Sequence, residues 1–414
     1  MDKKSTAQVD ASSVVWEDLE MWVRRQVQGF IQGLLEDEVT ELLGRGKFER
    51  RGAVDAAAGY RNGYGKARTL TLGCGTVEIR RPRVRGLEAR FESRILPLFK
   101  KRSKAVSELL PELYLHGLAL GDFELALRGL LGDGASLSAS TVARLKEKWQ
   151  ADCEAWGCRR LDELEPVYLW VDGVYVKAGL DKDKAALLVV IAGLADGRKE
   201  LVALVAGHRE SEAAWSSVLR DLKRRGLRCS RLVIGDGHLG IWAGLRNVYP
   251  DAAEQRCWNH RILNVLDKIP KRRQAPARLQ LKQIPYAATE REALRLKQRF
   301  QAWCRSHGLD EAASAIERDW ERMVAFYRFP KKHWTHVRTT NVIESPFAAL
   351  RLRTNAAKRF KKVENATAVI FKMLRVAETR FRRLNATELL REVFLGVEFQ
   401  NGVRVKQQHQ EAAA

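Results

Sequence analysis

The chain has 414 residues, and 73 Lys and Arg residues against 51 Asp and Glu residues give it a formal net charge of +22. Apolar residues make up 45% of the chain, enough for folded cores, which excludes a wholly disordered protein. The longest unbroken apolar run, residues 185–195, falls well short of the ~20 residues that cross a bilayer. We therefore expect a cytoplasmic protein without a membrane partner, and its six scattered cysteines predict free thiols.

Most of the net charge lies in two segments. Residues 80–104 contain ten basic and two acidic side chains, and residues 351–385 contain eleven basic and two acidic ones. Either segment alone is also typical of a solvated helix or loop face. Two of them in a strongly basic chain favour a partner that carries phosphate groups, such as nucleic acid.

The N-terminal region is predicted to combine helices with a small hairpin. Apolar positions that recur every three or four residues predict a helix over residues 14–43. Residues 68–72 and 76–80 alternate around a Gly-Cys-Gly turn, which predicts a hairpin, and the basic run at 80–86 is expected on an exposed loop.

Three short helices are predicted next, over residues 103–116, 122–131 and 138–149. This pattern is typical of a helix-turn-helix that binds DNA, and a plain three-helix packing unit is the alternative. A serine within residues 136–140 can cap the third helix, which would present Arg144 and Lys148 to DNA.

The middle of the chain predicts an α/β domain of the ribonuclease H-like class, because its elements follow the order three strands, helix, strand, helix, strand. The predicted strands are residues 167–177, 184–194, 200–205, 231–234 and 254–258, and the helices are residues 212–225 and 242–248. Helical periodicity continues to about residue 317, which predicts an all-helical insertion. The expected segments are 1–102 (N-terminal helix and basic hairpin), 103–160 (helix-turn-helix-like), 161–260 (catalytic core), 261–335 (insertion), 336–400 (closing helices with basic side chains) and 401–414 (tail).

Two aspartates stand on neighbouring strands of that predicted domain. Asp172 lies inside the first strand, where a charge without a partner is costly, and Asp236 ends the fourth, with Gly237 behind it. Two adjacent carboxylates repel unless a divalent cation such as magnesium lies between them. Because Asp-Gly is a common turn dipeptide, an ordinary turn role also stays open for each.

Glu344 is the best candidate for a third acid, since it lies where the insertion returns to the domain. Ser345 and Pro346 resemble an N-cap followed by proline at the first helical position, which would leave Glu344 just ahead of the helix. The spacing of Asn341 and Glu344 also fits a capping box, a purely structural role. Three acids that hold two metal ions suit an in-line attack on a phosphodiester.

Several segments, in this order, resemble mutator-type bacterial insertion-sequence transposases. They are YRNGY (60–64), PRVRG (82–86), WVDG (170–173), IGDGH (234–238), RCWNH (256–260) and HWTHVRTTN (333–341). The resemblance implies a DDE transposase in which Asp172, Asp236 and Glu344 are catalytic and hold two magnesium or manganese ions. It also implies a supporting role for Cys257 and His260, which match the family's Cys-x-x-His signature.

The resemblance further implies binding to double-stranded DNA at terminal inverted repeats, donor-strand cleavage, and strand transfer to target DNA through a circular intermediate. A homodimer or larger oligomer on DNA, and association with the nucleoid, follow from that activity. Two other functions stay open: a catalytically silent DNA-binding regulator derived from a transposase, and a ribonuclease H-like nuclease or junction resolvase.

Basic side chains near these segments are predicted to contact DNA phosphates. They are Arg81, Arg83, Arg85, Arg144, Lys148, Arg351, Arg353, Lys358, Arg359, Lys361 and Lys362. Cys304 and His307 repeat the Cys-x-x-His spacing, so a zinc site shared by both pairs is an alternative, although the helical pattern there favours ordinary packing. For Trp303 and Trp320, core packing is favoured over base stacking.

Overall fold

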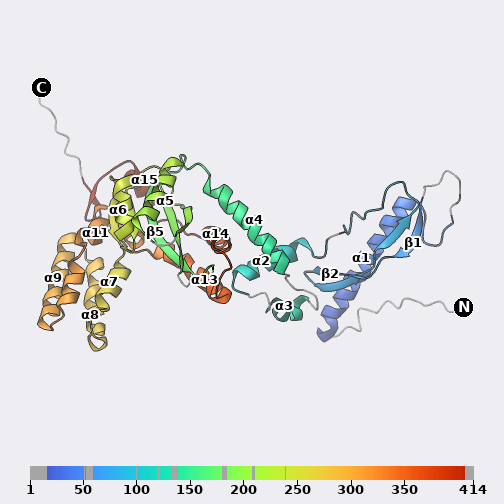
Figure 1. Ribbon diagram of the computed structural model, residues 1–414, viewed down its shortest axis with the longest axis horizontal. Coiled ribbons are helices and arrows are strands. Elements are labelled where there is room, and N and C mark those ends of the chain that lie inside the picture. Colours follow the sequence, from blue (N-terminus) through green and yellow to red (C-terminus); the bar gives the residue numbers. More distant parts are fainter. Residues whose placement is uncertain are drawn as a thin grey trace, which may run out of the picture. The chain divides into compact units, whose positions relative to one another are not determined.

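The structure is a computed structural model, and it describes residues 16–50, 52, 59–98, 100–118, 122–131, 139–179, 184–207, 210–237 and 239–405 (Figure 1). The chain divides into two compact units, Met1–Ala143 and Arg144–Ala414. Within the described ranges, no helix is both long enough and apolar enough to cross a membrane. Most of the predicted tail lies outside these ranges.

The first unit is built on one long helix and two short antiparallel pairs of strands. Its elements are α1 (Leu19–Leu43), β1 (Tyr60–Tyr64), β2 (Arg68–Leu72), β3 (Gly75–Ile79), β4 (Pro82–Arg85), α2 (Lys104–Leu115) and α3 (Phe123–Leu131). The predicted hairpin is confirmed as β2–β3. Leu35 of α1 packs with Leu70, Val77 and Ile79 of that hairpin, so the apolar stripe of the helix belongs to a core.

The basic run at residues 80–86 is not the exposed loop that we expected. Residues 82–85 form β4, which pairs antiparallel with β1. The pairing partner lies about twenty residues earlier, so the local alternation pattern carried no sign of it. Arg83 and Arg85 remain exposed on β4, whereas Arg81 is partly buried.

Three helices follow, as predicted. The third, α4 (Ala139–Gly157), is longer than expected and carries Arg144 and Lys148 as exposed side chains. The turn before it, with the serines at positions 136 and 138 that were candidates for its cap, lies outside the described residues. Ser103 caps α2, because its hydroxyl accepts a hydrogen bond from the Val106 amide.

A five-stranded mixed sheet forms the centre of the second unit, in the order β7-β6-β5-β8-β9. The first three strands are antiparallel, and β8 and β9 run parallel to β5. The elements are β5 (Pro166–Val176), β6 (Ala185–Leu194), β7 (Lys199–Gly207), α5 (Glu212–Arg224), β8 (Leu232–Gly235), α6 (Leu239–Val248) and β9 (Ala253–Arg256). The predicted order of strands and helices is confirmed.

The two faces of this sheet pack against different helices. Leu169 and Val171 of β5 share a core with Trp215 of α5 and Trp242 of α6, so these helices cover one face (Figure 1). Side chains alternate along a strand, so Trp170 and Asp172 point to the opposite face. There the Trp170 indole donates to the His336 carbonyl of α12 (Trp334–Val337).

Helices fill the chain between β9 and the closing segment, as predicted. They are α7 (Trp258–Leu266), α8 (Lys271–Gln283), α9 (Glu290–Ser306), α10 (Asp310–Glu317), α11 (Trp320–Val324) and α12. The closing elements are α13 (Asn341–Ala357), α14 (Val363–Glu378), α15 (Thr387–Phe394), β10 (Phe399–Gln400) and β11 (Val403–Arg404). Trp303 stacks on Phe300, and Trp320 meets Trp258 edge-on, which fits their expected packing role.

His336 gives the second unit a pH-dependent stability. Burial, with the nearby Lys199, lowers its pKa to about 4. An unfolded histidine titrates near 6.5, so the stabilisation is present above pH 6.5 and is lost as the pH falls towards 4. Replacing His336 with Gln should reduce the fall in the free energy of unfolding between pH 7 and pH 5 by about 1–2 kcal/mol, measured by urea unfolding at both values. An unchanged fall would contradict a neutral, partly buried His336.

Candidate active site

The sheet places the two predicted aspartates beside each other. In the parallel pair of β5 and β8, Trp170 stands opposite Ile234. Two residues further along both strands come Asp172 and Asp236, and both side chains are partly buried. The shorter strand β8 ends at Gly235, directly before Asp236, whereas Asp172 lies inside the longer β5, so the two carboxylates lie beside each other where β8 ends.

The electrostatics of Asp172 reflect this arrangement. Burial, together with the neighbouring Asp236 and Glu210 carboxylates, raises the pKa of its carboxyl to about 7, against a hydrogen bond from the Gly173 amide. Crowding of carboxylates that raises a pKa marks a site suited to a divalent cation. The donors are hard oxygen atoms, which fit magnesium or manganese.

Glu344 lies inside a helix, so the prediction that α13 begins at Ser345 and Pro346 is wrong. Helix α13 begins at Asn341, and the Glu344 amide donates to the Thr340 carbonyl at 2.9 Å. Pro346 is accommodated within the helix. Asn341 does not form the capping box either, because its side chain accepts a hydrogen bond from Asn259.

A cluster of three side chains links Glu344 to the strand edge. Cys257, at the N-terminus of α7, and His260 have ligand atoms within 4.8 Å of each other and of a Glu344 oxygen. The His260 Nδ1 atom is 3.7 Å from Glu344 Oε1. Contact with Cys257, together with the Glu344 and Asp236 carboxylates, raises the pKa of His260 to about 9, although burial opposes the rise. At neutral pH His260 is therefore a cation, and it interacts with Glu344 of α13 and with Asp236, which follows β8.

Thr340 completes this cluster and was missed by sequence reasoning. It is fully buried, its hydroxyl lies 3.1 Å from Cys257 Sγ, and the same hydroxyl donates to Glu344 Oε1. The Thr340 amide also donates to Cys257 Sγ at 3.3 Å. A protonated His260 and a sulfur atom with these contacts suit a role in holding Glu344 rather than in binding a metal.

The alternative of a shared zinc site is wrong. Among the residues that the structure describes, Cys257 and His260 cluster with Glu344 and not with the second pair. Cys304 is fully buried in α9, and the His307 ring contacts the Trp303 carbonyl at 2.8 Å. These two are packing residues.

Glu210 is a further acid at the site that the sequence analysis did not identify. It is 4% exposed, and its carboxylate hydrogen-bonds to the Tyr175 hydroxyl. It lies against Gly173, where a Cβ atom would come within 2.1 Å of a Glu210 oxygen. A side chain at position 173 would therefore displace the Glu210 carboxylate. His208 and Arg209, which directly precede Glu210, lie outside the described residues. No sequence spacing would have connected Glu210 with strand β5.

The C-terminal basic side chains approach the same end of β5. In the loop between α13 and α14, the Phe360 amide donates to the Lys177 carbonyl, and the Arg359 guanidinium donates to the Gly179 carbonyl. The exposed members of the predicted set are Arg351, Lys358, Arg359, Lys361 and Lys362. Arg353 is 4% exposed, so it is not available to a DNA backbone.

A second concentration of positive charge lies in the first unit. A cavity of about 480 Å³ is lined by Asn62, Gly65, Lys66, Arg68, Arg81, Pro82, Arg83, Val84, Arg85, Arg90, Phe91, Leu98 and Lys101. Seven of these lining residues are cationic and none is acidic. Burial and the neighbouring Arg68 lower the pKa of Arg81, which indicates positive charges held close together.

Comparison with known proteins gives a consistent result. Residues 2–383 match the family model described as Transposase, Mutator family. The chain is 44% identical over 297 residues to the transposase for insertion sequence element IS6120 of Mycolicibacterium smegmatis, over 72% of this chain and 92% of that protein. It is 37% identical over 282 residues to the transposase for IST2 of Acidithiobacillus ferrooxidans, over 67% and 94%.

A longer alignment reaches the transposase for ISRM5 of Rhizobium meliloti, at 29% identity over 353 residues, 84% of this chain and 85% of that protein. The family match covers both units and every one of the three acids. The resemblance found in the sequence motifs is confirmed, and the chain belongs to the Mutator family of transposases.

Proposed function

We propose that the chain is a DDE transposase of a bacterial insertion sequence. It binds double-stranded DNA at the terminal inverted repeats, cleaves the donor strand and transfers the freed end to target DNA. The observation that carries this proposal is the neighbouring placement of Asp172, inside β5, and Asp236, directly after the adjacent parallel strand β8, together with His260, which interacts electrostatically with both and lies 3.7 Å from Glu344. The mixed sheet with this placement supports a ribonuclease H-like catalytic core.

Asp172, Asp236 and Glu344 would hold the divalent cations. Two such ions supply Lewis-acid activation of the attacking oxygen and stabilise the leaving oxygen of a phosphodiester. The protein's own residues set the geometry: the Thr340 hydroxyl and the His260 cation orient the Glu344 carboxylate. The fully buried Cys257 contacts both the Thr340 and the His260 side chains.

The exposed basic side chains bind the phosphates of DNA. The loop at residues 358–362 lies beside the end of β5, a few residues beyond Asp172, so it is placed to hold phosphates next to the scissile bond. The cationic cavity of the first unit, with Arg81, Arg83 and Arg85, supplies a second contact with the backbone. Arg144 and Lys148 of α4 extend the proposed contacts. Because two ends are joined in one reaction, the active form is a dimer or larger oligomer.

The proposal is tested with labelled DNA ends of the element that encodes the chain, incubated with the full-length protein and magnesium, manganese or EDTA. Cleavage and joining with either metal, and neither reaction with EDTA, are expected. Cleavage without joining would instead indicate a nuclease. Specific binding to the ends without cleavage in either metal would indicate a DNA-binding regulator on a transposase scaffold.

Replacing Lys358, Lys361 and Lys362 with Gln is expected to weaken DNA binding about tenfold or more at moderate salt. Each lost phosphate contact removes about 0.9 from the slope of log affinity against log salt, so the slope should fall by about 2–3. The measurement is DNA affinity by fluorescence anisotropy at several salt concentrations.

A matched control removes the same charge from the opposite face of the sheet. Arg220, Arg224 and Arg228 are exposed on and just after α5, which packs on the face away from Asp172. Replacing these three with Gln should leave the salt slope within error of the wild type. Equal losses in both variants would show that net charge alone, rather than the 358–362 loop, governs binding.

A further inference from the structure

The turn at Asp236 and Gly237 is contacted by one arginine, Arg256. Gly237 has φ +101, a backbone conformation that favours glycine, and a Cβ atom there would lie 2.0 Å from the Arg256 Nε atom. Arg256 ends β9, opposite Gly235 of β8, and its Nε atom donates to the Asp236 carbonyl at 3.3 Å. The guanidinium therefore covers the turn and binds its backbone.

Arg256 is in turn held by a carboxylate from the helical segment. The Arg256 Nη1 atom lies 2.6 Å from Asp319 Oδ2, and the two side chains are 12% and 23% exposed. Asp319 precedes α11, far along the chain from the strand edge. An ion pair this short and this sheltered fixes the orientation of the guanidinium plane.

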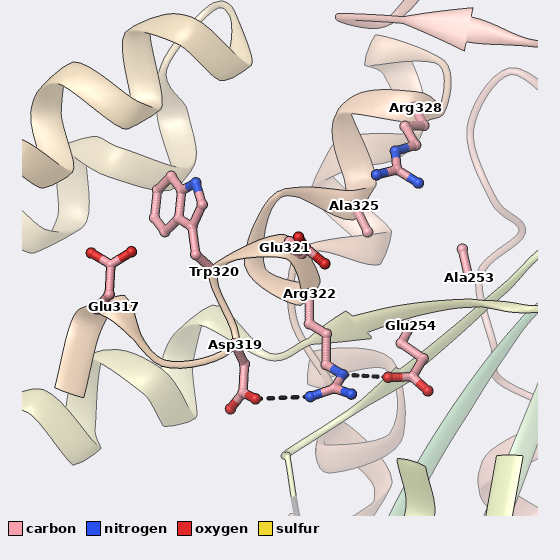
Figure 2. A pocket seen from close by; sticks show the side chains of 9 residues that line it. All are labelled: Ala253, Glu254, Glu317, Asp319, Trp320, Glu321, Arg322, Ala325 and Arg328. Atoms are coloured by element: carbon pink, nitrogen blue, oxygen red, sulfur yellow. Dashed lines mark hydrogen bonds and ion pairs between the residues drawn. The ribbon is translucent and has the colours of Figure 1, made fainter. Parts of the chain in front are cut away.

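Three arginines converge on Asp319. Besides Arg256, the Arg261 Nη2 atom lies 3.0 Å from Oδ2, and the Arg322 Nη1 atom lies 2.8 Å from Oδ1. Figure 2 shows Arg322 between Asp319 and Glu254, so the third arginine is itself tied to β9. Both carboxylate oxygens of Asp319 thus accept from charged donors.

The backbone of Asp319 indicates that this placement has a cost. Its φ is +58, in the left-handed region that a residue with a side chain rarely adopts. A conformation of this kind is strained and persists where the surroundings determine it, often at functional sites. The three arginine contacts stabilise this backbone conformation and orient the Asp319 carboxylate towards Arg256.

We propose that Asp319 is a positioning residue for the proposed transposase site: it holds Arg256 against the Asp236–Gly237 turn and thereby sets the geometry in which Asp236 meets a divalent cation. The helical segment therefore contributes to the metal site without supplying a ligand to it. This inference rests on the proposed function for the role of Asp236, and on the contacts above for the link to Asp319.

A purely structural role for Asp319 predicts a different result. Arg261 also donates to the Ala315 and Arg318 carbonyls, at 2.6 and 2.7 Å, so the cluster helps to fasten the helical segment as well. If fastening were its whole role, removing the Asp319 charge would lower thermal stability and leave metal affinity unchanged. A positioning role lowers metal affinity even where the fold is intact.

The experiment is a calorimetric titration of the full-length protein with Mn²⁺, with Asp172→Asn as the reference that lacks the site's heat. For Asp319→Asn, the dissociation constant for Mn²⁺ is expected to rise about tenfold or more, the usual effect of losing an outer contact of a metal site. Arg256→Lys keeps the charge, cannot hold Asp319 and the carbonyl together, and should show the same rise. Either variant decides the question if the other fails to fold.

The matched control is Glu317→Gln. Glu317 lies two residues earlier and pairs with Lys297 of α9 at 3.0 Å, and within the described part of the chain it makes no contact with the turn at Asp236. It should lower thermal stability without changing Mn²⁺ affinity. Wild-type affinity in both Asp319→Asn and Arg256→Lys would overturn the inference, as would an equal loss in Glu317→Gln.

Cleavage of labelled ends, measured beside the titration, separates the two claims. If the wild type binds Mn²⁺ but does not cut, the proposed function fails and the titration still decides the role of Asp319. If the wild type shows no Mn²⁺ heat beyond Asp172→Asn, the inference fails, because there is no metal geometry for Asp319 to set.

Discussion

Replacing Asp172 or Asp236 with Asn, or Glu344 with Gln, is expected to lower the rates of end cleavage and joining by ~10³-fold or more. The amides keep the size of the carboxyl groups and remove the charge that holds the cations. DNA affinity should stay within about threefold of the wild type, because the basic surfaces are separate from these side chains. The measurements are single-turnover cleavage and anisotropy of labelled ends.

Asp196→Asn is the matched control, since it tests the alternative that an Asp-Gly pair is only a turn. Asp196 and Gly197 follow β6 at the end of the sheet far from Asp172, and Asp196 binds the Arg198 amide and guanidinium. Its loss should leave both rates near the wild type. A wild-type rate in Asp172→Asn, or an equal loss in Asp196→Asn, would contradict the three-acid site.

The sheet could be predicted because its signals are local. The buried runs of β5, β6 and β7 are long and β-rich, and α5 is closed by Gly226, so both the type and the order of the elements followed from short windows. The position of Asp172 and Asp236 on adjacent strands then followed from that order. The β1–β4 pair depends on a partner outside any such window, which is why it was missed.

The start of α13 shows where a local rule gives way to tertiary contacts. Ser345 and Pro346 carry a start signal, but the helix begins earlier, where the Thr340 amide and hydroxyl are fixed by Cys257 of another segment. Nothing near residue 340 in the sequence reveals that sulfur atom. Arg353 is different: it lies three residues beyond the buried Leu350, so helical spacing alone places it on the buried face of α13.

The ion pair between Asp319 and Arg256 could not be predicted from the sequence for the same reason. Asp319 and Arg256 are separated by more than sixty residues, and neither has a sequence signal for the other. Sequence motifs identify the residues that touch the reacting atoms, because the chemistry restricts which residue types can serve there. They do not identify the residues that orient those groups, since many different side chains can do so once the fold brings them together.

Replacing Thr340 with Val is expected to raise the Mg²⁺ concentration for half-maximal cleavage about 10-fold to 100-fold. The methyl group fills the space of the hydroxyl, and the partly buried Glu344 carboxylate loses a charge-assisted hydrogen bond. The carboxylate is then free to rotate towards the His260 cation, 3.7 Å away. The measurement is the cleavage rate against Mg²⁺ concentration at saturating DNA.

Two further variants show whether the hydroxyl itself is responsible. Thr340→Ser keeps the donor and should restore an Mg²⁺ requirement near the wild type, because only a methyl group is lost. Thr367→Val removes a hydroxyl that bonds to the Val363 carbonyl within α14, with no contact to Glu344, and should change nothing beyond a small loss of stability. If Thr340→Val requires no more Mg²⁺ than Thr367→Val, the Glu344 carboxylate is oriented by His260 alone, and the hydroxyl serves only its contact with Cys257.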